Sequence, residues 1–208
     1  MKKELINWKA IFIFLLIITF ALFFFFPFYF MVSSSFKHPL DSSVYPPIIF
    51  NFEPTLKNYT TIFKKYPMAT YFINSFIVAT FATLVSMVLA IPASYGMERL
   101  ISKNRERVAY MFLTMQLIPP ISMVFALFWY ANFFGILGTY WLLVIGYTLW
   151  NVPYAIWLTR GFFTTIPKEL EEAAFVDGAS RIWVLRKIII PLTKPGIIAA
   201  TIFIFIGA

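Results

Sequence analysis

Four of the nine acidic residues in this sequence lie close together, in the segment from 166 to 180. Glu169, Glu171 and Glu172 follow Pro167 there, and Asp177 comes one turn later. Proline suits the first position of a helix, and acidic side chains in the opening turns complement the positive end of the helix dipole. The segment therefore predicts a short helix whose carboxylates could pair with basic groups.

The residues that follow carry signals for a helix end and a second helix. Gly178 can adopt the left-handed backbone conformation that ends a helix. Ser180 can cap a second helix from Arg181 to Ile190, before Pro191. We therefore expect two short helices that meet at an elbow.

One face of the first helix consists mainly of small side chains. The residues at spacings i, i+3, i+4 and i+7 on that face are Leu170, Ala173, Ala174 and Asp177. Small side chains let another protein approach closely, and the neighbouring acids give it groups to pair with. A connector that packs only against its own helices would show the same pattern, so these residues alone favour docking and packing about equally.

The sequence offers little support for other kinds of site. No glycine is followed by the lysine of a phosphate-binding loop, so we expect no ATP site of that kind. Cysteine is absent, and the single His38 lies beside Pro39 without clustered metal ligands. Proton- or sodium-coupled carriers usually need an ionisable group within the membrane, and the apolar stretches contain none. Their neutral polar residues could line a pathway or bond between helices: Asn74, Ser86, Gln116, Ser122 and Asn151.

The composition places these residues in a membrane protein. Of 208 residues, 61% are hydrophobic and only 12% are charged, whereas soluble domains carry about 25% charged residues. A water-soluble globule, a disordered tail and a coiled coil are therefore excluded. We expect an all-α polytopic helical bundle.

The uncharged stretches predict where the chain crosses the membrane. Residues 10–31 form a first helix; a secretory signal is the alternative, but its apolar core would be far longer than the usual 7–15 residues. Further helices are expected near Met68–Tyr95, Val108–Ala131 and Tyr140–Phe163, with a glycine-containing turn at 132–138. A fifth begins at Ile197. Only about 12 residues, or roughly 18 Å of helix, remain there against about 30 Å of hydrocarbon, so we expect the fifth helix to be incomplete and the sequence truncated.

The basic residues predict the topology. Thirteen of the seventeen precede the first helix or lie between the second and third or the fourth and fifth, which places the N-terminus in the cytoplasm. An excess of this kind marks cytoplasmic loops, not nucleic-acid binding. We expect a cytoplasmic N-terminus at 1–9, a membrane helix at 10–31 and an extracytoplasmic loop at 32–67 that ends in an interfacial helix. Residues 68–208 form the core, with a cytoplasmic loop at 164–196.

The amino-acid sequence of that cytoplasmic loop resembles a known motif. Binding-protein-dependent ABC importer permeases carry a coupling loop written EAA-x3-G-x9-I-x-L-P. Its counterparts here are Glu172, Ala173, Ala174, Gly178, Ile188, Ile190 and Pro191, with isoleucine in place of the leucine. Further features along the chain, including Asn74-Ser75 and Arg160-Gly161-Phe162-Phe163, resemble the carbohydrate-uptake branch and the second permease subunit of maltose-type transporters.

The resemblance implies a six-helix subunit of the type I ABC importer permease kind, with about five spans present here. Its partners would be a homologous second permease, two ATP-binding subunits and an extracytoplasmic solute-binding protein. ATP and Mg²⁺ would be used by the ATP-binding subunits, while this chain binds no cofactor and catalyses no reaction. The residues implied to couple it to the ATPase are Leu170, Glu171, Glu172, Ala173, Ala174, Asp177, Gly178, Ala179 and Pro191.

The expected function is a sugar-importing permease, multi-pass in the lipid of a prokaryotic plasma membrane. The sequence assigns no solute-contacting residue. The alternatives are an ABC permease for a solute other than a sugar, an ATP-independent secondary carrier or channel, and a membrane scaffold without a transport role.

Overall fold

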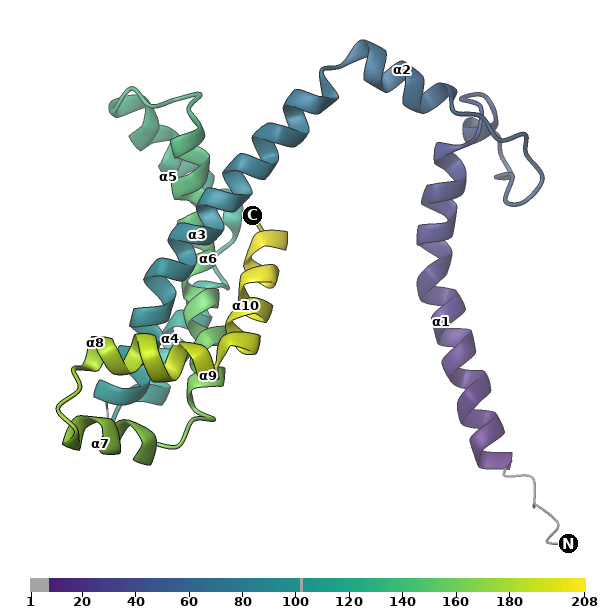
Figure 1. Cartoon of the computed structure of the whole chain (residues 1–208). Helices are drawn as coiled ribbons and strands as arrows, with labels where there is room; N and C mark the ends of the chain where they lie inside the picture. Colours follow the sequence, from purple (N-terminus) through teal and green to yellow (C-terminus); the bar gives the residue numbers. More distant parts are fainter. Residues whose placement is uncertain (1–7, 102) are drawn as a thin grey trace, which may run out of the picture. The chain divides into compact units, whose positions relative to one another are not determined.

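The computed structural model describes residues 8–101 and 103–208. This part of the chain is all-α and contains no strand (Figure 1). Three of its helices are long and apolar enough to cross a membrane, or up to five if each of two bent helix pairs counts as one span. It divides into two compact units, residues 1–71 and 72–208, which are described separately.

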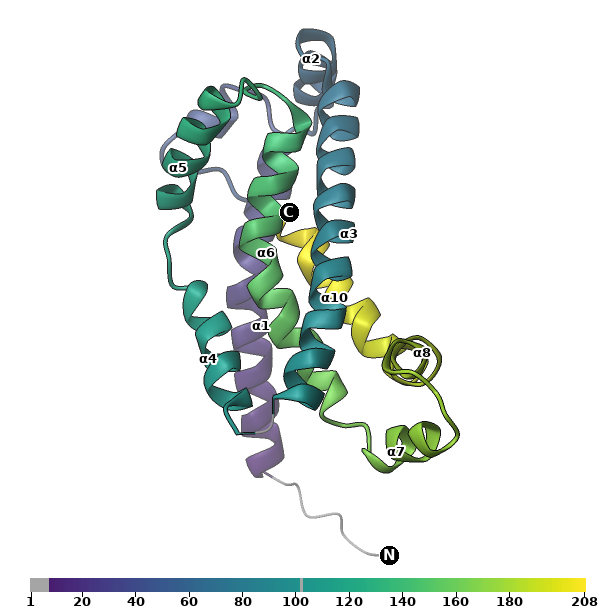
Figure 2. The same cartoon turned by 90° about the vertical axis from the view of Figure 1, so that its left-hand side faces the viewer.

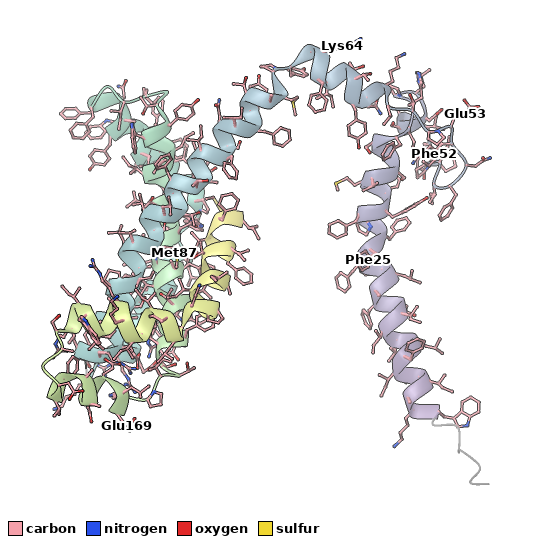
Figure 3. The ribbon with its side chains drawn as sticks, in the orientation of Figure 1. Phe25, Phe52, Glu53, Lys64, Met87 and Glu169 are labelled. Atoms are coloured by element: carbon pink, nitrogen blue, oxygen red, sulfur yellow. The ribbon has the colours of Figure 1, made fainter. Side chains whose placement is uncertain are left out.

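The first unit contains α1 (Trp8–Ser35), a 3-10 turn at Asp41–Ser43 and α2 (Lys57–Lys65). Helix α1 carries no charged residue after Lys9, and α2 is the amphipathic helix expected near the end of the 32–67 loop. The loop is fastened by Asn58, whose side-chain amide donates to the carbonyls of Ser35 and Lys37. The Lys37 ammonium lies between the rings of Phe30 and Phe52, 4.9 and 5.1 Å from their centres; Phe52 is labelled in Figure 3.

The second unit is a bundle around α3 (Met68–Leu100), α6 (Tyr140–Phe163) and α10 (Lys194–Ile206) (Figure 2). Helix α4 (Arg105–Met115) packs on α6, as does α5 (Pro120–Phe133). Small side chains at the contacts, among them Ala90, Ala155 and Ala200, let these helices approach closely. Their largest shared core consists of Met87, Ala90, Met97, Ala109, Ala155, Ile156, Ala200 and Ile204.

The prediction of one continuous helix over Val108–Ala131 is wrong. The structure has two helices, α4 and α5, bent by 79° at the break between them. Pro119 has extended backbone angles because the residue before a proline avoids the helical conformation, and Pro120 opens α5. The glycine turn after α5 is confirmed, with positive φ angles of 67° at Gly135 and 76° at Gly138.

The C-terminal helices also differ in detail from the prediction. The second helix of the 164–196 segment begins at Arg181 as expected, but it continues past Pro191 as α8 (Arg181–Val184), a π-helical turn (Leu185–Ile189) and α9 (Ile190–Leu192). The wider π turn accommodates the proline ring, which would clash with the carbonyl four residues back in an α-helix. After an 82° bend, α10 starts at Lys194, three residues before the expected Ile197, because Pro195 fits the first turn of a helix.

Candidate functional site

The predicted elbow is present at one end of the second unit. Its first helix, α7 (Glu169–Val176), begins two residues after Pro167, which therefore lies outside the helix and not at its first position. Gly178 has a φ of 85° and ends α7: its N–H donates to the Phe175 carbonyl at 3.0 Å, and the Ala179 N–H donates to the Ala174 carbonyl at 2.9 Å. This is the Schellman arrangement that a left-handed glycine permits.

The second helix of the elbow starts as predicted. The Ser180 hydroxyl accepts a hydrogen bond of 3.3 Å from the Trp183 N–H at the start of α8. Helices α7 and α8 lie one above the other, joined by a short loop (Figures 1 and 2). The loop geometry is therefore fixed by backbone hydrogen bonds and one side-chain cap.

A groove of about 720 Å³ lies between the two helices of the elbow. We call it the elbow groove; its lining residues are Leu170, Ala173, Ala174, Asp177, Gly178, Ala179, Ser180, Trp183 and Ile188. The four residues predicted to share one face of α7 all belong to it. Its floor is made of small side chains, and Leu170 remains 46% exposed. The groove can therefore receive a protruding apolar side chain of another protein.

The remaining predicted coupling residues lie outside the groove. Glu172 is exposed on α7, and Pro191 is exposed on α9. Glu171 is instead buried, with only 4% of its surface exposed, so its carboxylate is not free to pair with another protein. The structure thus brings six of the nine predicted residues together and places three elsewhere.

Glu171 ties α7 to the end of α3. Its carboxylate accepts a hydrogen bond of 2.9 Å from the Tyr95 hydroxyl and one of 2.5 Å from Nε of Arg99. The Arg99 guanidinium also donates to the carbonyls of Phe163 and Ile166, at the end of α6 and just beyond it. One buried arginine therefore fixes the position of the elbow relative to two long helices.

A second cluster of ion pairs, centred on the buried Glu98, joins α3, α4 and α6 at the same end of the unit. Glu98, 4% exposed, accepts from Nε of Arg160 at 2.9 Å and lies 3.2 Å from Nη1 of Arg105. Arg160 also pairs with Glu106 of α4. The sequence analysis did not predict that these arginines form ion pairs. The adjacent Glu98 and Arg99 at a helix end were the available signal for buried ion pairs.

The neutral polar residues of the apolar helices differ in their surroundings. The Gln116 side chain donates to the Trp150 carbonyl at 2.9 Å, which is a bond between helices. Ser86 and Asn151 are buried and have side-chain atoms without a hydrogen-bond partner in the described part of the chain. Within residues 8–101 and 103–208, no group of three histidine or acidic side chains could hold a metal ion.

The sequence pattern of the family described as "Binding-protein-dependent transport system inner membrane component" matches residues 90–208. The trehalose/maltose transport system permease protein MalG of Thermococcus litoralis is 31% identical over the whole chain, which spans 74% of that relative. The sulfoquinovosyl glycerol transport system permease protein SmoH of Agrobacterium fabrum is 31% identical over 88% of the chain, which covers 64% of its length.

A solved structure has the same fold. It is the crystal structure of a bacterial ABC transporter involved in the import of the acidic polysaccharide alginate, with a TM-score of 0.75 and 21% identity. The match covers 95% of this chain and 69% of the other. The all-α type I importer permease architecture expected from the sequence is therefore confirmed.

Proposed function

Because the chain belongs to the family of binding-protein-dependent transport system inner membrane components, we propose that it is a membrane-spanning permease subunit of an ATP-driven sugar importer. The elbow groove supports this proposal most directly. It lies on a surface formed by two short helices that are braced against the ends of α3 and α6. Such a surface can receive force from another subunit and pass it to the spans.

The partner in the elbow groove is an ATP-binding subunit. Its contact would be an apolar side chain seated over Ala173 and Ala174, with a basic group near Asp177 or Glu172. ATP and Mg²⁺ belong to that partner, and this chain carries no hydrolytic step. The remaining partners are a second permease, another copy of the ATP-binding subunit and an extracytoplasmic solute-binding protein.

Coupling depends on the buried Arg99–Glu171 pair. When the ATP-binding subunits close, α7 moves with them, and the pair carries this displacement to α3 and the end of α6. The cytoplasmic end of the pathway closes as these helices shift. The N-terminus and the elbow then lie in the cytoplasm, as the basic residues indicate.

Co-purification tests the proposal. We expect a tagged copy of this chain, isolated from its native membranes in mild detergent, to bring down an ATP-binding subunit and a second permease. Ala173→Trp should abolish capture of the ATP-binding subunit, because the indole fills the groove. Val176→Trp is the matched control: Val176 lies on the same helix, is 88% exposed and does not line the groove.

Transport measurements separate the remaining alternatives. A sugar importer requires ATP and the binding protein, whereas a secondary carrier transports with an ion gradient alone. A scaffold shows no dependence on any solute. Uptake that persists without an ATP-binding subunit would contradict the proposal.

A further inference from the structure

A group of buried polar side chains lies between α3 and α6, away from the elbow. We call it the mid-span polar cluster, and it consists of Thr83, Ser86, Thr148 and Asn151. Their exposed fractions are 3%, 0%, 8% and 4%. The hydroxyls and the Asn151 amide nitrogen have no hydrogen-bond partner among the described residues.

Two contacts between α3 and α6 show where this cluster lies along the two helices. Near one end of the α3–α6 contact, Val78 and Ala82 pack against Val144. Near the other, the hydroxyls of Ser94 and Thr159 lie 2.5 Å apart. The two helices therefore run in the same direction (Figure 2), and the cluster lies between these contacts, close to the middle of each helix.

The end of α10 adjoins the cluster. A Cβ atom placed on Gly207 would lie 3.7 Å from Oδ1 of Asn151. Transporter solute sites typically lie near the bilayer midplane, where helices from different parts of the chain meet. Three helices meet at the cluster.

The unpaired hydroxyls are unusual for threonine and serine in a helix. Such side chains commonly donate to a carbonyl of the preceding turn. Thr159 and Thr201 do so in these same helices, to Ala155 and Ile197. Buried polar groups are normally hydrogen-bonded, and no lipid can supply the bond. The cluster is therefore suited to a polar group that arrives from outside the chain.

The chemistry of the cluster restricts that group. Hydroxyls donate and accept, and the amide nitrogen donates, so the cluster complements hydroxyl groups. Neither α3 before Glu98 nor α6 before Arg160 contains a charged residue. A carboxylate or ammonium at this depth would lack a counter-charge.

We propose that the mid-span polar cluster contacts the hydroxyl groups of a neutral, polyhydroxylated solute as it passes through this subunit. The inference rests on the proposed function and adds a site to it. The cluster is closed in this structure, so α3 and α6 separate at its level when the pathway switches. Thr83, Ser86, Thr148 and Asn151 then select for neutral sugars over acidic ones.

Thiol labelling tests whether the cluster reaches the aqueous pathway. Because this chain has no native cysteine, an introduced cysteine is the only thiol in it that can be labelled. Ser86→Cys is introduced into the assembled transporter in proteoliposomes and treated with a water-soluble methanethiosulfonate reagent. We expect the labelling rate of this chain to rise at least tenfold when ATP and binding protein are added. Val88→Cys is the control: Val88 is 69% exposed and, two positions from Ser86, lies on the opposite side of α3, so it should label slowly in both conditions. Equal, slow labelling of both variants would overturn the proposal.

Sugar competition tests the contact itself. Trehalose, maltose and glucuronic acid are compared as agents that slow the labelling of Ser86→Cys during turnover. We expect protection by a neutral sugar and none by glucuronic acid; protection by none of them, or by glucuronic acid alone, would contradict the proposed selectivity.

Isosteric substitutions provide a second readout. Thr83→Val combined with Asn151→Leu should raise KM for the protecting sugar about tenfold, because a site built for a hydroxyl loses its partner. Thr201→Val should leave KM unchanged, since that hydroxyl bonds to its own helix. If the transporter assembles and imports sugar but labelling and KM do not respond, this inference fails and the proposed function stands. If no ATP-binding subunit co-purifies, the proposed function itself fails.

Discussion

Arg99 and Glu171 form an ion pair across 72 positions of sequence, with Nε of Arg99 2.5 Å from Oε1 of the carboxylate. Both side chains are almost excluded from solvent, at 7% and 5% exposed. The pair joins the end of α3 to α7, and the same guanidinium holds two carbonyls at and beyond the end of α6. It connects the elbow directly to the long helices, beside the apolar contact of Val184 and Ile189 with Tyr95 and Phe163.

Removing one partner of this pair should destabilise the elbow strongly. Glu171→Gln leaves the Arg99 charge buried without a counter-ion, and breaking a buried pair on one side costs about 3–5 kcal/mol. We expect lower thermal stability in detergent and an ATPase rate that no longer responds to sugar. Glu169→Gln is the control, since Glu169 is exposed on the same helix.

Replacing both Arg99 and Glu171 shows how much of the lost stability comes from the unpaired charge and how much from lost packing. Arg99→Met with Glu171→Met should be less destabilising than Glu171→Gln alone, because no charge is left unpaired. A double variant as unstable as the sum of its single changes would show that the pair is not the source of the effect.

Gly178→Val should impair coupling with little effect on membrane insertion. The φ of 85° is strained for a β-branched residue, at a cost of roughly 1–2 kcal/mol or more. Membrane levels of the chain should be normal, while transport and association with the ATP-binding subunit fall. Gly161→Val tests the specificity, because Gly161 lies in α6 with open space around it and no positive φ. Wild-type uptake by Gly178→Val would remove the coupling role assigned to the elbow.

Apolar length predicted α1, α3 and α6 well, because a span needs little more than an uncharged run of sufficient size. The same criterion did not predict the bend between α4 and α5. Pro119 and Pro120 interrupt the helix, but they carry no charge and so do not interrupt the uncharged stretch. The Schellman turn at Gly178 was predictable because its signal is local. The burial of Glu171 was not, because its partner Arg99 lies on another helix and local spacing carries no information about tertiary pairing.

The sidedness of the chain can be tested with introduced cysteines. Ser42 lies in the loop predicted to be extracytoplasmic, Ser180 lies in the elbow, and both are exposed. In intact cells, an impermeant thiol reagent should label Ser42→Cys and leave Ser180→Cys unlabelled until the cells are opened. The reverse pattern would invert the topology and place the elbow away from any cytoplasmic partner.

Gly196→Ala should disturb the bend between α9 and α10. A Cβ atom at Gly196 would lie 2.2 Å from Cγ of Phe162, far inside van der Waals contact, and Gly196 itself is buried. Overpacking of this kind typically costs about 1–3 kcal/mol. We expect a lower melting temperature of the purified complex and weaker coupling, because α10 can no longer pack on the end of α6.

A compensating change tests whether the close approach of Gly196 to Phe162 causes the loss of stability in Gly196→Ala. Phe162→Ala with Gly196→Ala removes Cγ and both Cδ atoms, which are the atoms nearest the new methyl group, so the double variant should be more stable than the sum of the two single changes. Phe162→Ala by itself should be destabilising, through lost packing. If the two single effects simply add, the effect of Gly196→Ala comes from the backbone of the bend. The glycine would then be required there for its conformational freedom and not for the space that it leaves to Phe162.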